Sequence, residues 1–451
     1  MNNQDKFNEL RKKYPDFIYE KYEILFDSEN LNIKYYFNIP GLTYFYPEIK
    51  INKKYIKTNY DEEYLNYLVF QIGLIELISY VKCTCSPNIN IKCGYVNDKQ
   101  IKFLNKLYFN GLGEFLYTNH ISVNSDELFN VFCTHDVMSL GKIQYNGVGN
   151  LICVGGGKDS CVSLELLKNE ENNSCFIINP KGPSYDSCVV AGYGDDEIIG
   201  VKRILDRKIV ELNQKGYLNG HTPFSSIVAF ITYLVAYLNG KKNIILSNEA
   251  SANQPTVIGT NINHQYSKTY EFEFDFMNYM NEFIPLDIKY FSLLRGLSEF
   301  NIARLFSHYK KYHSVFKSCN VGSKGETWKW CCNCSKCLFV YIILSPFIDR
   351  DERVKIFGED LFEKKELLET FKEILGYSDT KPFECVGTLE EARYAISLVL
   401  DKGVEHSYLL EYYRKHYPLF LDGSEINKYN EENNIDDYFD KLVKEEMNKY
   451  V

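Results

Sequence analysis

The sequence lacks the features that mark a nucleic-acid-binding or a secreted protein. Its 451 residues carry a net charge of −9 and contain no long basic run. This balance argues against an extensive nucleic-acid surface and leaves room only for a local basic groove, so we expect no nucleic-acid partner. Residues 1–17 contain no apolar core of the kind that a signal peptide needs. We therefore expect a cytoplasmic protein.

No uncharged stretch predicts a membrane-spanning helix. The longest, residues 222–240, is slightly shorter than a bilayer requires. It begins at Thr222-Pro223 and ends at Gly240, which are the start and stop signals of an ordinary helix. We interpret it as a buried core helix and expect no association with membranes.

The 14 cysteines do not predict a disulfide framework, because no secretion signal accompanies them. Instead, five of them fall between residues 319 and 337. Four have the spacing C-x11-C-x2-C-x2-C, which suits a closed, structural zinc site with tetrahedral geometry. An iron–sulfur cluster is the alternative metal centre, and a cluster without metal is the third possibility. The predicted ligands are Cys319, Cys331, Cys334 and Cys337, with Cys332 as a spare thiol.

Neither of the common nucleotide-binding glycine loops, G-x-x-x-x-G-K-[ST] and G-x-G-x-x-G, is present at the most glycine-rich turn. Residues 151–167 (LICVGGGKDSCVSLELL) instead predict a buried strand, a turn of three glycines and the first turns of a helix. Glycines allow an anion to approach the backbone, and the first N–H groups of the helix are unpaired donors. An ordinary strand-to-helix turn is the alternative. The loop is similar to the S-G-G-x-D-S loop of the PP-loop ATP pyrophosphatases, with Gly155 in place of the serine and one hydroxyl donor fewer.

The order of apolar and amphipathic segments predicts an α/β fold. We expect strands at 151–154, 174–179 and 243–246, a helix at 200–213 and an earlier helix at 60–81 that Asp61 or Thr58 caps. The predicted class is a PP-loop (adenine nucleotide α-hydrolase-like) parallel sheet with helices on both faces. The loops after 154, 179 and 246 should face one crevice, because ligands bind beyond the carboxyl ends of parallel strands. The predicted divisions are an N-terminal α+β accessory domain over 1–147, the ATP-binding domain over 148–315, and a helical, zinc-containing region over 316–451.

Two polar segments follow the third predicted strand and are candidates for catalysis. The segment INHQYSK, residues 262–268, brings His264, Tyr266 and Lys268 together and could supply acid, base and carboxylate-binding groups. Asn248, Glu249 and Ser251 lie in the loop after 246. Polar, solvated turns are the alternative for both segments. We read residues 111–115 (GLGEF) as a turn and residues 219–223 (NGHTP) as the start of a helix.

Eight short strings give the chain a resemblance to a known family. In order along the chain they are GGGKDS at 155, LNGHTP at 218, SNEASAN at 247, NHQYSK at 263, SCN at 318, C-x2-C-x2-C at 331, IFGEDL at 356 and KPFECVG at 381. Together they resemble the ATP-dependent UDP-N-acetylmuramoyl-L-alanyl-L-glutamate epimerase (MurL) family over roughly residues 60 to 400. The resemblance implies inversion of the terminal L-Glu of a nucleotide-sugar peptide to D-Glu, with ATP converted to AMP and pyrophosphate.

The resemblance implies roles for particular residues. The loop residues Gly155, Gly156, Gly157 and Ser160, together with Asn179, would hold ATP and its pyrophosphate, and Asp159 would help hold Mg²⁺. Lys158 would neutralise charge in the transfer or merely face solvent. The acid and base would come from His264, Tyr266, Lys268, Glu249 and Cys385, although Cys385 is alternatively a buried small residue. Substrate carboxylates or phosphates would meet Arg203 and Lys268, with Asn248 and Ser251 nearby.

Three alternatives to this activity stay open at the level of sequence. The first is epimerisation of another peptide. The second is a PP-loop enzyme that adenylates a nucleobase, either a tRNA-modifying enzyme or one similar to 7-cyano-7-deazaguanine synthase, which has a similar four-cysteine zinc site. The third is a protein that senses ATP without chemistry.

Overall fold

One mixed β-sheet organises the chain. The computed structural model describes residues 2–134, 140–180, 182–257, 259–322, 328–378 and 381–450. Its 11-stranded sheet has the order β11-β10-β7-β8-β9-β4-β2-β1-β5-β6, with β3 paired to β2. The strands are β1 Asp16–Phe26, β2 Asn30–Ile39, β3 Thr43–Phe45, β4 Glu48–Asn52, β5 Asn88–Ile91, β6 Asn130–Cys133, β7 Asn150–Cys153, β8 Ser174–Ile178, β9 Ile198–Ile204, β10 Asn243–Leu246 and β11 Lys289–Ser292.

The strands from β7 to β11 form a parallel half-sheet that is covered on both faces. Successive side chains of a strand point to opposite faces. Leu151 of β7 and Ile244 of β10 accordingly belong to one buried cluster, and their neighbours Ile152 and Ile245 belong to the other. The strand order places the switch point of the half-sheet between β7 and β10, where ligands bind in open α/β sheets.

The remaining strands extend the same sheet. β4 pairs antiparallel with β9, with Ile51 opposite Val201, and then continues through β2 and β1 to β5 and β6. The segments 1–147 and 148–315 therefore share one hydrogen-bonded sheet, and the boundary predicted at residue 147 falls between β6 and β7.

One predicted element is wrong. Residues 200–213 were expected to form a single helix, but 200–204 belong to β9, and the helix α9 covers only Lys208–Gln214. Ile199 and Val201 are buried in the sheet, and the pairing with β4 and β8 satisfies the backbone of this segment. The strands predicted at 151–154, 174–179 and 243–246 are confirmed as β7, β8 and β10.

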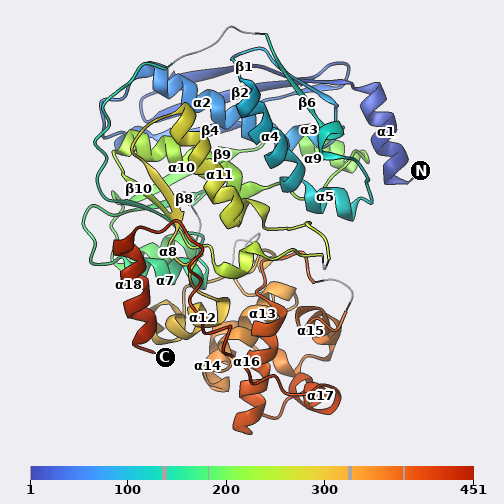
Figure 1. Ribbon diagram of the computed structural model, residues 1–451, viewed down its shortest axis with the longest axis vertical. Coiled ribbons are helices and arrows are strands. Elements are labelled where there is room, and N and C mark those ends of the chain that lie inside the picture. The colour runs from blue at the N-terminus through green and yellow to red at the C-terminus, as the bar shows by residue number, and fades with distance from the viewer. Residues whose placement is uncertain are drawn as a thin grey trace.

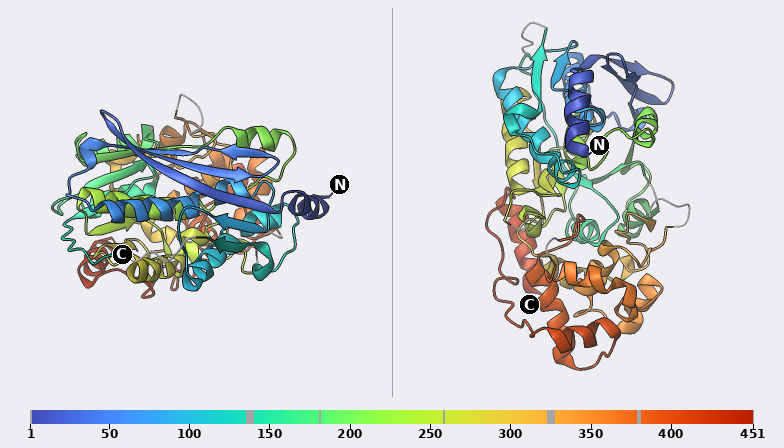
Figure 2. Two further views of the ribbon diagram at one scale, coloured as in Figure 1. Left: turned by 90° about the horizontal axis from the view of Figure 1, so that it is seen from above. Right: turned by 90° about the vertical axis from the view of Figure 1, so that its right-hand side faces the viewer.

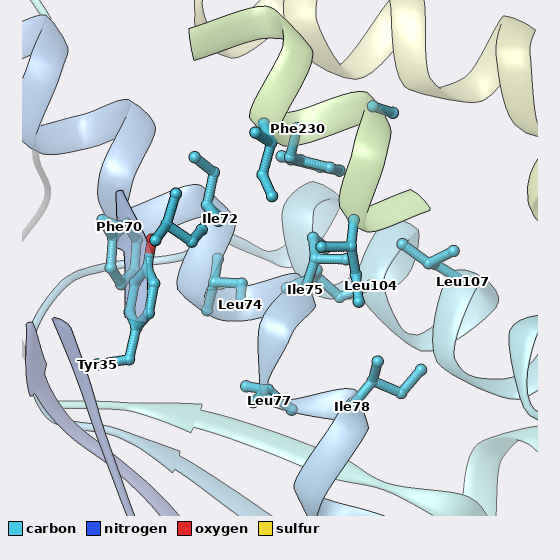
Figure 3. Close-up of a cluster of buried hydrophobic side chains, with 14 of the residues drawn as sticks. Tyr35, Phe70, Ile72, Leu74, Ile75, Leu77, Ile78, Leu104, Leu107 and Phe230 are labelled. Atoms are coloured by element: carbon cyan, nitrogen blue, oxygen red, sulfur yellow. The ribbon is translucent and has the colours of Figure 1, made fainter. Parts of the chain in front are cut away.

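Three apolar helices pack against the sheet and form much of its core. The predicted helix at 60–81 is confirmed as α2 Glu62–Glu76 and α3 Ile78–Val81, capped by Asp61, and α10 Phe224–Asn239 ends at Gly240 as expected. The segment Glu62–Val81 is long and apolar enough to cross a membrane, but 94% of its most apolar window is buried within the protein. Figure 3 shows its side chains between Tyr35 of the sheet, Leu104 of α4 and Phe230 of α10.

The other helices surround the sheet. Those after residue 333 form a helical layer at the end of the molecule opposite β1 and β2 (Figures 1 and 2). These other helices are α1 Asn3–Lys13, α4 Asp98–Gly111, α5 Gly113–Thr118, α6 Ser125–Leu128, α7 Lys158–Leu166, α8 Gly182–Ala191, α11 Tyr270–Phe283, α12 Glu299–His308, α13 Ser335–Leu344, α14 Arg350–Phe357, α15 Leu368–Ile374, α16 Leu389–Lys402, α17 Tyr408–His416 and α18 Asp437–Asn448.

Candidate active site

The glycine loop lies between β7 and α7. Gly156 has a φ of +83°, and a Cβ there would lie 2.6 Å from the backbone nitrogen of Ser184. Its own N–H donates to Ser160 Oγ at 3.2 Å, and that hydroxyl donates to the Gly157 carbonyl at 2.9 Å. A Cβ on Gly155 would meet nothing within 4 Å, so the loop is open at that residue. The geometry allows an anion to reach the backbone N–H groups.

A cavity of about 530 Å³ covers this loop. Its walls include Gly155 and Ser160, Asn179 after β8, and Asn248 and Glu249 after β10. The three loops that the strand order predicts to share a crevice therefore do so. The volume lies within the range of pockets for small molecules and cofactors, about 300–1,000 Å³.

The C-terminal region closes the other side of this cavity. Its contribution comes from the segment around Ser318 and from Lys336 on α13. The backbone N–H of Lys317 donates to the carbonyl of Gly156 at 2.8 Å, which fixes this segment against the glycine loop. The site is therefore built from both the sheet and the helical layer.

Three carboxylates converge beside the glycine loop. Those of Asp159, Glu249 and Glu299 have oxygen atoms within 4.8 Å of one another. Lys158 forms ion pairs with Asp159 and Glu299 and is only 2% exposed, so the alternative in which it faces solvent is wrong. Burial raises the pKa of Glu249, and the charge of Asp159 raises it further. An oxygen-rich cluster of this kind can bind a divalent cation.

A second group of ionisable side chains extends from the cavity. Lys268 lines the cavity, and its Nζ donates to Cys385 Sγ at 3.0 Å. Cys385 also interacts electrostatically with His264, whose Nδ1 lies 2.5 Å from Glu114 Oε2. The Nδ1 atom of His221 lies 3.1 Å from the same oxygen. The fold thus brings Cys385 next to Lys268, which lies 117 positions earlier in the chain, and next to His264 in the same segment as Lys268.

The other predicted site residues take different places. Tyr266 lines a separate cavity of about 460 Å³, and burial raises its pKa to about 12. Arg203 binds Glu76 through two hydrogen bonds of 2.8 Å, and it is absent from the described lining of the first cavity. Ser251 is buried and donates to Glu249 Oε1 at 3.4 Å.

Sequence reasoning missed Glu114, His221 and Glu299 as members of the site. Residues 111–115 were expected to form a turn, but α4 ends at Gly111 and α5 begins at Gly113, which places Glu114 in the first turn of α5. His221 lay in a motif that was read only as the start of a helix. Residues 219–223 do precede α10, and the carbonyls of Gly220 and His221 both accept from Lys82.

Arg295 holds two of the site loops together and was also missed. Its guanidinium is fully buried and donates to the carbonyls of Glu249, at 2.9 Å, and Lys268, at 2.6 Å. A carboxylate oxygen of Glu273 lies 3.2 Å away and balances its charge. The positions of Glu249 and Lys268 therefore depend on one buried cation.

The four predicted metal-ligating cysteines converge, as their spacing implies. The sulfurs of Cys319, Cys331, Cys334 and Cys337 all lie within 4.8 Å of one another, with separations of 4.0, 3.7 and 3.4 Å for 319–334, 331–337 and 334–337. Four thiolates about 2.3 Å from zinc in a tetrahedron would be about 3.8 Å apart. Cys332 points elsewhere, with its sulfur 3.3 Å from the carbonyl oxygen of Phe357.

Comparison with known proteins places the chain in a family of enzymes. The family model of the MurL N-terminal domain matches residues 8–293, and that of the MurL C-terminal domain matches residues 315–422. The chain therefore belongs to the MurL family.

Curated relatives agree with this assignment. The chain is 33% identical over 337 residues to the UDP-N-acetyl-alpha-D-muramoyl-L-alanyl-L-glutamate epimerase of Xanthomonas oryzae pv. oryzae, covering 73% of this chain and 74% of the relative. It is 36% identical over 336 residues to the protein of that name from Salinispora tropica, covering 73% and 72%. The relative of the same name from a Micromonospora species is 34% identical over 330 residues, covering 72% and 73%. No solved structure matches the chain significantly. The relatives support an enzyme that acts as an epimerase.

Proposed function

We propose that this protein inverts the terminal L-Glu of UDP-MurNAc-L-Ala-L-Glu to D-Glu and converts ATP to AMP and pyrophosphate in the process. The observation that carries the proposal is that the open glycine loop and Lys268, which is bonded to Cys385, line one cavity. The names of the relatives supply the substrate. A phosphate site and a proton-transfer site are thereby within reach of one bound peptide.

The need for ATP follows from the low acidity of the C–H bond at the α-carbon of the substrate. Removal of the α-proton next to a free carboxylate would place a second negative charge beside the first. Transfer of AMP to that carboxylate gives an acyl-adenylate with a neutral carbonyl, which can accept the electron pair as an enolate. Hydrolysis of the adenylate then releases the D-acid. The same cavity would hold the substrate through all of these steps.

The residues of the glycine loop would each have a separate role in the activation of the substrate carboxylate. The backbone N–H groups of Gly155–Gly157 and the hydroxyl of Ser160 would hold the departing pyrophosphate, and Asn179 lines the same cavity. Asp159 would help bind Mg²⁺, which neutralises phosphate charge when it is present. Lys158 is already engaged by Asp159 and Glu299 and would orient these carboxylates.

The test is incubation with ATP, Mg²⁺ and UDP-MurNAc-L-Ala-L-Glu in D₂O. We expect AMP, pyrophosphate and D-Glu that carries deuterium at the α-carbon. Asp159→Asn should lower the rate of pyrophosphate release by about 100-fold or more, which is the usual scale for loss of a charge-stabilising group. Asp287→Asn is the matched control, because Asp287 is exposed and precedes β11 at the far end of the strands.

Two results would contradict the proposal. Absence of deuterium at the α-carbon would exclude epimerisation of this peptide, and deuterium in another peptide with a free carboxylate would indicate a different substrate. Tight, salt-sensitive binding of tRNA together with release of pyrophosphate would instead indicate adenylation of a nucleobase.

We propose that the four-cysteine cluster binds zinc as a structural centre. Its four thiols occupy all positions of a tetrahedral site and leave none for a substrate. Cys319 also lines the cavity and follows directly on the segment bound to Gly156. Zinc would thus fix that segment against the glycine loop.

Replacement of one ligand should release the metal. We expect about one zinc ion per chain in the unaltered protein and close to none in Cys334→Ser, with a lower midpoint of thermal unfolding, because metal binding contributes to folding free energy. Elemental analysis and calorimetry give both quantities. Cys332→Ser should keep the zinc, because its sulfur faces Phe357 and not the cluster. Iron with absorption in the visible range would contradict the assignment.

A further inference from the structure

A cysteine, a histidine and a glutamate form a series of neighbouring side chains that leads to Lys268 in the wall of the cavity. Cys385 is close enough to His264 for each to shift the pKa of the other, and His264 Nδ1 lies 2.5 Å from Glu114 Oε2. His221 adds a second ring on the same carboxylate oxygen, with the two ring centroids 4.5 Å apart. The members come from α5, the loop before α10, the segment after β10 and the loop before α16. Segments so distant in the chain meet here around one sulfur atom.

We propose that Cys385 is the base that removes the α-proton of the activated glutamate, and that Glu114 and His221 act as positioning residues for His264 behind it. This inference rests on the proposed function. It assigns the proton-transfer step to one atom, Cys385 Sγ, and gives roles to two residues outside the recognised motifs of phosphate binding.

The position of Cys385 distinguishes it from the other candidates. Lys268 lines the nucleotide cavity and lies 3.0 Å from the sulfur, so a peptide carboxylate activated there would pass close to Cys385. Tyr266 faces a different cavity, and Glu249 belongs to the carboxylate group beside the glycine loop. Lys268 is suited to a second task, because an ammonium group next to the acyl carbonyl would stabilise the enolate oxygen.

The charges around the sulfur favour the thiolate. Burial alone would raise the pKa of Cys385, but the neighbouring cations lower it well below its usual value. The charged groups that face it are Lys268, His264, Lys336, Glu249 and Glu384. Burial would likewise lower the pKa of His264, whereas its hydrogen bonds to Cys385 and Glu114 raise it to about 9. A thiolate next to an imidazolium is the reactive form of a catalytic cysteine.

Glu114 explains the orientation of His264. Since Nδ1 is engaged by the carboxylate, Nε2 is the nitrogen available to Cys385. Burial and the charge of His264 together lower the pKa of His221 to about 4, so His221 is neutral and donates an N–H to Glu114. The imidazolium of His264 therefore lies between two negatively charged groups, the carboxylate of Glu114 and the thiolate of Cys385.

The proton transfer balances without any further reagent. The Cα–H bond breaks as the S–H bond of Cys385 forms, and the electron pair moves into the acyl carbonyl to give the enolate. A proton from water then adds to the opposite face of the α-carbon. The S–H proton of Cys385 then passes to solvent, which restores the thiolate beside the imidazolium of His264, so one proton enters and one leaves in each turnover.

Separate measurement of the two half-reactions tests the assignment. Exchange of labelled pyrophosphate into ATP, in the presence of the peptide, reports adenylation alone, whereas deuterium at the α-carbon reports proton transfer. In Cys385→Ser we expect exchange within about threefold of the unaltered protein and deuterium incorporation lowered by about 10³-fold, the scale of a lost general base. Deuterium incorporation near the original rate would overturn the inference and leave the proposed function intact. Absence of pyrophosphate exchange in the unaltered protein would overturn both.

A thiol-specific readout tests the positioning residues. The rate of alkylation of Cys385 by iodoacetamide, followed by mass spectrometry of its peptide, should stay high at pH 6 in the unaltered protein. In Glu114→Gln the rate should fall at pH 6 and recover only at higher pH, with kcat lowered about 10-fold or more and KM little changed. Glu114→Asp, which keeps the charge, should restore part of both. Glu127→Gln, on the exposed turn of α6, is the control. An unchanged alkylation profile in Glu114→Gln would contradict the role of Glu114.

Discussion

Replacement of Lys158 by methionine should lower the free energy of unfolding by about 3 kcal/mol at pH 7, the lower end of the scale for breaking a buried ion pair. Lys158 is 2% exposed and neutralises Glu299, which is also buried, together with Asp159. Methionine keeps the volume of the side chain and removes its charge, which leaves two carboxylates close together in a site with little water. Urea unfolding at several pH values measures the effect.

The loss should depend on pH in a defined direction. Burial raises the pKa of Glu299 well above its usual value, and Lys158 opposes this rise. Without Lys158 the folded-state pKa increases further, so the folded protein holds a proton that the unfolded chain releases above about pH 4.5. At pH 5 the free energy of unfolding of the variant should be close to that of the unaltered protein. As the pH rises to 7.5 it should fall below that value, by at most about 1.4 kcal/mol per pH unit for one group.

Two controls separate charge from packing. The double variant Lys158→Met with Glu299→Gln removes both charges of the pair and should recover much of the lost stability. Lys168→Met removes a lysine whose side chain is 46% exposed and whose partner is Glu165, so it should change the free energy of unfolding by less than about 1 kcal/mol. A loss in Lys158→Met that is the same at pH 5 and pH 7.5 would contradict the electrostatic explanation.

Arg295→Met should remove both stability and activity. The guanidinium donates to the backbone of Glu249 and of Lys268, and it is the buried counter-ion of Glu273. Its loss leaves two carbonyls without these donors and one buried carboxylate without its cation, at a cost of about 3–5 kcal/mol. Because both loops line the cavity over the glycine loop, the proposed pyrophosphate exchange should also fall by about 100-fold, the scale of misplaced active-site groups.

Arg353→Met is the matched control for this second prediction. Arg353 is equally buried and pairs with Glu405, but it belongs to α14 and binds the carbonyls of Ser345 and Ile348. Its replacement should cost a similar amount of stability and leave exchange unchanged at a temperature where both variants are folded. Equal loss of exchange in the two variants would show that general destabilisation accounts for the effect of Arg295.

Features that are continuous in the chain could be predicted from the sequence. The glycine loop, the helix 62–76 and the C-x2-C-x2-C cluster each have their signals within a few residues, and the strands after 150 alternate with helices. The shared crevice of three loops followed from the general rule that parallel strands end at the same edge. Local chemistry and strand order were sufficient for these features.

The rest depends on contacts between distant segments. Glu114 reaches His264 across 150 positions in the chain, and Lys158 reaches Glu299 across 141. Neither partner has a local signal, because a glutamate on a short helix looks like any solvated residue. The error at 200–204 has the same origin: pairing with β4, which lies in another part of the chain, determined a strand where the local pattern favoured a helix.

Because β4 pairs with β9, the chain cannot be divided near residue 148 without exposing a strand edge. A fragment that began at residue 148 would retain β9 but lose β4, and so would present a row of unpaired N–H and C=O groups along that strand. Such an edge is a template for self-association. In addition, Phe176 and Ile199 would lose part of the buried cluster that they share with the first half of the chain. The two halves of the chain thus form one structural unit, because the strands before the glycine loop complete the sheet from which that loop emerges.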